Sequence, residues 1–297
     1  MRKRKVSVSK VKTSQSQRPP AVKMADVVRF IGVSIAGGKS DKACVAILEY
    51  YPQNKKIFLA RLFEKIKSEG EISGDLKIHE LISQDDQTVK YVAFDAALSL
   101  PQCLTCKVKC PGFELCNEPH IEWMWRHFRE YKKGKKPVKL FTPYTQRAVE
   151  MYFQTKLEEK FDIHHAMGAN SAPLMARAMY IKNHLPAGLE CIEVYPKLTM
   201  WRLGESLGLV KSTLKDHRAA FGGDESREKF IQALSEKNIA FIYHQDAKSM
   251  IENSHAFEAF LCGMTAFLKY KNLVEPRPKN FPKSEAWIDF PIKGIKL

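Results

Sequence analysis

The sequence has no run of 18 or more apolar residues, which excludes a helix that spans a membrane. Its basic N-terminus lacks the apolar stretch that a secretory signal needs, so we expect a cytoplasmic protein with no membrane partner. Glycine and proline number only 15 each among 297 residues, which excludes collagen-like and low-complexity chains. The length allows one large domain or two small ones, with a core that needs no disulfides.

Acids are scarce in two short segments that carry most of the net charge of +15. Residues 1–24 contain eight lysines and arginines and no acid, whereas residues 126–139 contain seven against Glu130. Since the first segment has almost nothing to bury, we expect residues 1–25 to form a disordered basic tail. Each segment is either solvated or a contact for nucleic acid. In the second case the body would bind nucleic acid through Arg126, Lys132, Lys133, Lys135 and Lys136.

The apolar pattern predicts an α/β protein. Runs of β-favouring residues at 28–36, 43–50 and 56–64 are separated by turn signals and predict a three-stranded meander. Buried strands are predicted at 89–95 and 190–194, and a further short strand at 239–243. Helical spacing predicts helices at 74–84, 145–160, 171–184, 196–207, 224–237 and 254–270, the last capped by Ser254. We therefore expect a mixed, five-stranded central sheet that is flanked by helices.

This alternation is interrupted after Pro101 by a stretch that is first rich in cysteine and then in lysine. We interpret residues 102–140 as an insertion after the fourth strand, within a domain that covers residues 26–275. The remaining residues, 276–297, contain four prolines, and we expect them to wrap the surface of this domain.

Three acids lie among apolar residues: Asp95 ends a predicted strand, Glu193 lies in another, and Glu258 lies in the last predicted helix. A buried carboxylate is costly unless it pairs with a base, binds a metal or lies at the mouth of a site. His255 precedes Glu258 by three residues, so both lie on one face of the helix. That spacing suits two metal ligands or a ligand and a general base, and also a capping histidine beside a solvent-facing glutamate.

Four segments carry a family resemblance. They are FIGVSIAG at 30–37, VAFDAALSLP at 92–101, IEVYP at 192–196 and HAFEAFLC at 255–262. In this order they resemble an uncharacterised family of predicted RNase H-like nucleases, over roughly residues 28–270. The resemblance implies an RNase H-like fold. In that superfamily, acids from the first strand, the fourth strand and the last helix together hold two divalent ions, which stabilise the attacking and leaving oxygens of phosphodiester hydrolysis.

Carried over by position, the resemblance assigns Ser34 to the first-strand place, Asp95 to the fourth-strand place and Glu258 to the last-helix place. Glu193 would be an added acid, and His255 would carry the proton. This implies a nuclease that uses Mg²⁺ or Mn²⁺. The superfamily pattern has aspartate where Ser34 stands, and serine is a poor ligand for Mg²⁺. The alternative is therefore a non-catalytic module of the same fold that binds nucleic acid or a protein.

Four of the seven cysteines, Cys103, Cys106, Cys110 and Cys116, lie within 14 residues. We do not expect disulfides in a chain without an export signal, whereas four thiolates on one loop suit structural Zn²⁺ or an iron–sulfur cluster. Free or redox-active thiols are the alternative. Because the basic stretch follows directly, the insertion is a candidate for a metal-bound lobe that binds nucleic acid.

Arg147 precedes a predicted helix that contains Glu150. Its planar guanidinium suits the phosphate of a nucleic acid. It equally suits a site carboxylate or an ordinary pair with Glu150 along the helix.

Overall fold

A computed structural model describes residues 27–36, 42–84, 88–132, 139–157, 163, 165–214 and 217–296. The expected basic tail at 1–25 lies outside the described residues, and so do Lys133, Lys135 and Lys136. In the described ranges no helix is both long enough and apolar enough to cross a membrane.

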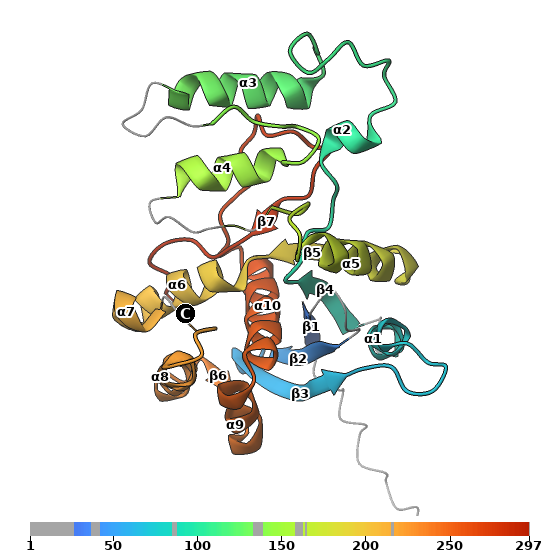
Figure 1. Cartoon of the computed structure of the whole chain (residues 1–297). Coiled ribbons are helices and arrows are strands. Elements are labelled where there is room, and N and C mark those ends of the chain that lie inside the picture. The colour runs from blue at the N-terminus through green and yellow to red at the C-terminus, as the bar shows by residue number, and fades with distance from the viewer. Residues whose placement is uncertain are drawn as a thin grey trace, which may run out of the picture.

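One mixed sheet forms the centre of the molecule (Figure 1), with the strand order β6-β3-β2-β1-β4-β5-β7. The antiparallel meander that we expected consists of β1 (Val28–Ile35), β2 (Ala43–Tyr51) and β3 (Lys56–Ile66). β4 (Val89–Phe94) pairs in parallel with β1, and β5 (Glu190–Val194) in parallel with β4. The α/β class is thereby confirmed.

The expected number of five strands was wrong, because the described sheet has seven. β6 (Ala240–Phe241) lies in the predicted short strand, beside β3, and β7 (Ile288–Asp289) lies in the C-terminal segment, beside β5. Each has two residues, too few for apolar alternation to reveal membership of the sheet. β7 also shows that residues 276–296 do more than wrap the surface, since they complete one sheet edge and bury Phe281 and Phe290.

Helices cover both faces of the sheet, which explains why β1 is a continuous apolar run. On one face, α1 (Gly74–Ser83) and α5 (Ala172–His184) pack against the strands, and on the other lies α10 (Ser254–Tyr270). α10 contacts β1 so closely that a Cβ atom on Gly32 would lie 1.9 Å from the carbonyl oxygen of Ala259. The N-cap of α10 is Asn253 rather than the expected Ser254, because the Asn253 side chain accepts hydrogen bonds from the backbone N–H groups of residues 255 and 256.

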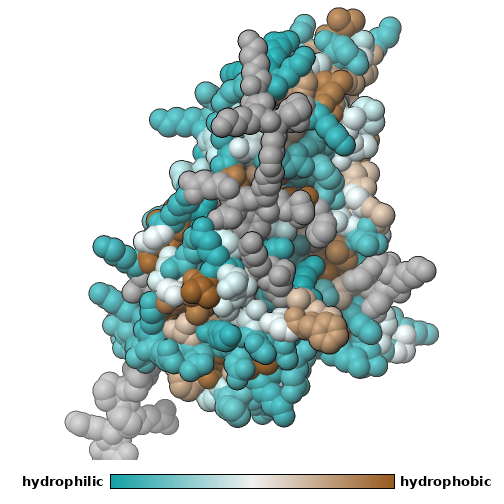
Figure 2. All heavy atoms as spheres, turned by 60° about the vertical axis from the view of Figure 1, so that its left-hand side comes forward, coloured by the Kyte–Doolittle hydropathy of each residue, from teal (hydrophilic) through white to brown (hydrophobic). Residues whose placement is uncertain are grey.

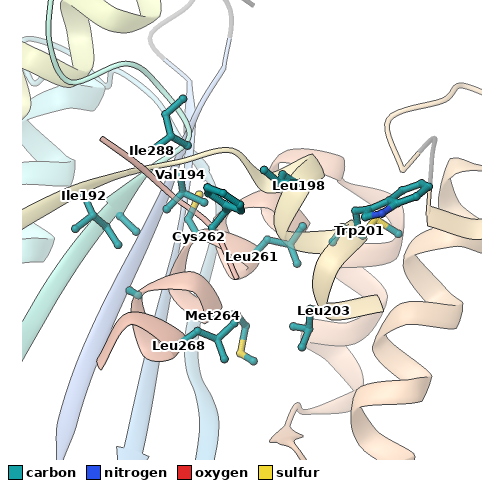
Figure 3. Packing of buried hydrophobic residues seen from close by; sticks show 14 of the residues in the cluster. Ile192, Val194, Leu198, Trp201, Leu203, Leu261, Cys262, Met264, Leu268 and Ile288 are labelled. Carbon is teal, nitrogen blue, oxygen red and sulfur yellow. The ribbon is translucent and has the colours of Figure 1, made fainter. Parts of the chain in front are cut away.

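The core on the α10 side joins three further elements (Figure 3). Leu198, Trp201 and Leu203 of α6 (Pro196–Leu207) lie beside α10 residues such as Leu261. Ile192 and Val194 of β5 and Ile288 of β7 complete this part of the cluster. Cys262 is fully buried within it. This packing fixes the first turns of α6 and α10 relative to the ends of β4 and β5.

The remaining helices lie at two ends of the molecule (Figure 1). The expected insertion holds α2 (Gln102–Thr105) and α3 (Pro119–Lys132), with α4 (Ala148–Lys156) next to α3. Trp125 of α3 packs against Phe113, Phe128 and Phe141, so it is part of the packing of this lobe. At the other end lie α7 (Lys211–Leu214), α8 (Gly223–Glu236) and α9 (His244–Glu252).

Candidate functional site

Side chains from three elements converge at one end of the central strands. Ser34 lies near the end of β1, Asp95 follows β4, and His255 and Glu258 lie in the first turns of α10. β1 and β4 are parallel neighbours, so Ser34 and Asp95 reach the same edge of the sheet. One ligand atom each of Asp95, His255 and Glu258 lies within 4.8 Å of the other two. No other group of three histidine, cysteine or acidic residues in the described ranges meets this distance.

Asp95 is held against the end of β1. Its backbone N–H donates to the Val33 carbonyl at 3.2 Å, and its Oδ1 atom accepts a hydrogen bond from the Ile35 N–H at 3.0 Å. Burial raises the pKa of Asp95 to about 7, the charge of Glu258 adds to this, and the bond from Ser34 opposes it. A cation beside this carboxylate would therefore restore its charged form.

Ser34 links Asp95 to His255. Its Oγ atom lies 2.5 Å from Asp95 Oδ2 and 3.0 Å from His255 Nδ1, and the residue is fully buried. The single hydroxyl proton is donated to Asp95, so Oγ accepts a hydrogen bond from Nδ1–H of His255. This arrangement leaves His255 Nε2 with a free lone pair. Ser34 does not line the adjoining pocket, and its role is to orient these two side chains rather than to hold a metal.

Glu258 is buried and is held by two bases on the segment after α7. Its Oε1 atom accepts a hydrogen bond from His217 Nε2 at 2.8 Å and another from Arg218 Nε. Its Oε2 atom lies 2.6 Å from Arg218 Nη2. Burial favours the neutral acid, but the bonds from His217 and Arg218 outweigh it and lower the pKa of Glu258 to about 2. Nothing in the sequence pattern singled out His217 or Arg218, which precede Glu258 by 41 and 40 residues.

These groups lie in a pocket of about 600 Å³. Asp95, His255, Glu258 and Arg218 line it together with Lys197, the second residue of α6. Among the described residues Lys197 has no acidic partner within ion-pair distance. Burial lowers the pKa of His255, so this imidazole is neutral at pH 7. The pocket thus combines oxygen and nitrogen ligands with the cationic side chains of Lys197, Arg218 and the buried Arg147. This combination suits a phosphate ester and a divalent cation.

Glu193 lines the same pocket but is not part of the acidic group. Its two carboxylate oxygens each lie 2.8 Å from Arg147, at Nη1 and Nη2, and Arg147 Nε lies 2.9 Å from Glu150. Arg147 is only 1% exposed. Glu193 is therefore paired with a base, as Glu258 is, and Arg147 pairs with carboxylates. Of the alternatives considered for Arg147, the pair with a site carboxylate and the pair with Glu150 both occur.

The cysteine-rich segment brings its thiols near one another without gathering them tightly. All four are free, and Cys103 Sγ lies 3.7 Å from Nε2 of the buried His120. Burial and, to a smaller extent, the neighbouring thiols of Cys116, Cys106 and Cys110 raise the pKa of Cys103 to about 11. No three of these ligand atoms meet the 4.8 Å distance that the acidic group meets.

Of the five cations of this stretch that we expect to bind nucleic acid, the structure describes Arg126 and Lys132, and both are exposed on α3. None of the residues that line the pocket comes from α3. These cations therefore form a surface that is separate from the pocket.

Comparison with protein-family models, with curated proteins and with solved structures finds no match to this chain. The geometry of the pocket is therefore the basis for the function.

Proposed function

We propose that the protein is a hydrolase of phosphodiester bonds in nucleic acid that depends on a divalent cation. The observation that carries this proposal is the convergence of Asp95, His255 and Glu258 in a pocket that also holds Lys197 and Arg218. Carboxylate oxygens suit Mg²⁺ and Mn²⁺. A module that only binds nucleic acid, the alternative function, has no need of converging ligand atoms.

The positions of these residues also support an RNase H-like nuclease. Ser34 on β1, Asp95 after β4 and Glu258 on the last long helix occupy the three places that the family resemblance assigns. β1 also has β2 on one side and β4 on the other, so the strand that carries Ser34 is central in the sheet.

The charges favour one ion rather than two. The converging group has two carboxylates, Ser34 is neutral, Glu193 is neutralised by Arg147, and Arg218 adds a positive charge that Glu258 holds. Two divalent ions at this site would leave a large uncompensated positive charge. We therefore propose that Arg218 supplies the second positive charge that a two-ion site would obtain from its second metal.

When bound, the ion would polarise the phosphate and lower the pKa of a water molecule. Asp95 would hold it through either carboxylate oxygen and Glu258 through Oε2, since each of these oxygens accepts one hydrogen bond and keeps a lone pair. His255 would accept the proton of the attacking water at Nε2, because Ser34 occupies its Nδ1. Arg218, about half exposed, would bind the negative charge that develops on the phosphate oxygens.

The test is cleavage of single-stranded, duplex, hybrid and branched nucleic acids in Mg²⁺ and in Mn²⁺. Asp95→Asn and Glu258→Gln should each lower the rate at least about a hundredfold, a loss typical of a removed electrostatic group. Glu225→Gln, on the exposed surface of α8, is the matched control and should cleave at the wild-type rate. Absence of cleavage by the wild type, or equal cleavage by all variants, would overturn the proposal and favour the binding module.

The cysteine-rich segment supports a second, structural site. We propose that Cys103, Cys106, Cys110 and Cys116 hold Zn²⁺ or an iron–sulfur cluster, with His120 as a neighbouring donor. Between α2 and α3 the chain has no helix or strand, so a metal would supply the order that backbone hydrogen bonds do not. Elemental analysis and an absorption spectrum of protein purified without oxygen test this. A colourless, metal-free protein that is folded would refute it.

The exposed cations of the lobe complete the proposal. Arg126 and Lys132, together with Lys133, Lys135 and Lys136 of the same stretch, would bind the phosphates of the nucleic acid outside the pocket. Replacing Arg126 and Lys132 by glutamine should weaken binding of all sequences alike and reduce its dependence on salt.

A further inference from the structure

The segment between α7 and α8 carries an aromatic side chain that contacts almost nothing. Phe221 is 96% exposed, more than any other large hydrophobic residue in the described ranges. Single exposed apolar side chains are common on proteins and need no explanation by themselves. Phe221 differs because its own segment supplies His217, Arg218 and Ala219 to the pocket. Phe221 does not itself line the pocket, but it follows Arg218, which we propose to bind phosphate, by only three positions.

The backbone around Phe221 is anchored on both sides. Before it, Glu258 binds the side chains of His217 and Arg218, and the His217 carbonyl accepts a hydrogen bond from Arg227. After it, Gly222 has a φ of 78°, a left-handed conformation that glycine adopts without strain, and caps α8. The exposure of Phe221 is therefore a property of a turn whose backbone is anchored at both ends.

The spacing between Arg218 and Phe221 matches the chemistry of a polynucleotide. Phe221 follows Arg218 by three positions, so their Cα atoms lie within about 11 Å of each other. A strand whose phosphate contacts Arg218 would bring its own base or the next one within reach of the ring. Lys197 offers a second cation in the same pocket for the neighbouring phosphate. Phosphate and base follow one another along a nucleic acid strand, and in this turn one aromatic ring, Phe221, likewise follows one cation, Arg218.

A broad interface with a protein is a weaker explanation of the exposed ring. Figure 2 shows the side of the molecule that carries α6, α7 and α8, and the hydrophobic side chains that are visible beside its grey atoms form small separate groups among hydrophilic ones. Stable protein interfaces have a contiguous apolar centre. An isolated ring beside cations is instead typical of proteins that bind single-stranded nucleic acid.

We propose that Phe221 stacks on an unpaired base of the substrate, and that the pocket therefore selects single-stranded or frayed nucleic acid over paired duplex. This inference rests on the proposed function. Within a duplex both faces of each base are already stacked, so the ring finds a partner only where a base is free. Every base offers such a face, so stacking at Phe221 imposes little preference for sequence.

The test is binding of fluorescently labelled strands by the full chain, with Ca²⁺ in place of Mg²⁺ to suppress cleavage. Three probes of equal length are compared: a single-stranded oligonucleotide, the same phosphodiester backbone without bases, and a blunt duplex. Wild type should bind the single strand most tightly. Phe221→Ala should weaken that binding at least about fivefold and leave binding of the strand without bases unchanged. Phe221→Trp should restore the affinity, and Val210→Ala, which removes another exposed apolar side chain, should have no effect.

The outcomes separate this inference from the proposed function. Equal affinity of wild type and Phe221→Ala for the oligonucleotide would overturn the stacking inference, whether or not the protein cleaves nucleic acid. An equal loss on strands with and without bases would overturn it too, since the ring would then act on the fold or on phosphates. If the expected binding pattern appears but Mg²⁺ and Mn²⁺ support no cleavage, the inference stands and the proposed hydrolysis fails.

Discussion

Replacement of Arg147 by methionine removes the centre of the buried ion group beside the pocket. Arg147 donates two hydrogen bonds to Glu193 and one to the Glu150 side chain, and all three residues are buried. Methionine fills much of the same volume but brings no charge. Both carboxylates would then remain in the interior without their guanidinium.

The expected loss of stability is large. Removing one partner of a buried ion pair costs about 3–5 kcal/mol, and here two carboxylates lose the same cation, so we expect about 5 kcal/mol. That is a large part of the ~5–15 kcal/mol that keeps a domain folded. The control is Lys156→Met, whose partner is Glu130. Their side chains are 40% and 57% exposed, so this change should cost at most about 1 kcal/mol.

The acid side of the stability curve gives an independent check. Burial favours the neutral form of Glu150, but bonds from His165 and Arg147 outweigh it and lower the pKa of Glu150. A lowered pKa contributes stability that is complete above the ordinary value of 4.5 and is lost as the pH falls through the folded value. The free energy of unfolding of Arg147→Met should therefore fall less than that of the wild type as the pH is lowered from 5.

Urea denaturation, followed by circular dichroism at pH 7 and across the acid range, measures both effects. Changing Glu150 and Glu193 to glutamine in the Arg147→Met background should recover part of the lost free energy, because no buried charge is then left unpaired. A loss for Arg147→Met as small as that for Lys156→Met would refute the reasoning.

Three shorter predictions concern the fold and the site. Gly32→Ala should lower the free energy of unfolding by at least about 1–3 kcal/mol in thermal denaturation, because the new Cβ atom would lie 1.9 Å from a carbonyl oxygen of α10; an unchanged melting temperature would mean that α10 can shift. Asp95→Asn should stabilise the metal-free protein more at pH 8 than at pH 4. Because the pKa of Asp95 is raised to about 7 in the folded state, ionisation of this carboxyl lowers the free energy of unfolding of the wild type as the pH rises from about 4 through about 7. A difference between the denaturant midpoints of variant and wild type that is the same at both pH values would contradict this. Ser34→Ala should lower the cleavage rate about 10- to 100-fold, as the loss of a residue that orients a ligand does, while the circular dichroism spectrum stays the same; full activity would show that His255 is oriented by other contacts.

The sequence predicted most of the central sheet because β1 to β5 carry runs of β-favouring residues between turn signals. It predicted α10 for the same reason, through its apolar spacing. α3 was hidden, because its aromatic residues lie among the charges of a segment that resembled a loop. β7 was hidden by its length of two residues.

The candidate site was predictable only in part. Asp95, His255 and Glu258 stood out as polar residues in apolar elements, and they do meet. Their bases could not be found in this way, because an arginine is as common on a surface as in a buried pair. Only the tertiary structure brings Arg218 to Glu258 across 40 positions, and Arg147 to Glu193 across 46. The second pairing removes Glu193 from the set of free acids.

The hydrogen bond between Ser34 and His255 joins residues that are 221 positions apart. Glu285 similarly accepts a hydrogen bond from the N–H of Ala148, 137 positions earlier, and Ser99 accepts one from Ala286. A ribosome must therefore synthesise nearly the whole chain before these contacts can form. Until then the apolar faces of β1 and β4 are exposed. Folds with such distant contacts form slowly and are prone to aggregate before they close. During its synthesis this protein should depend on chaperones that cover the early strands until α10 and β7 arrive.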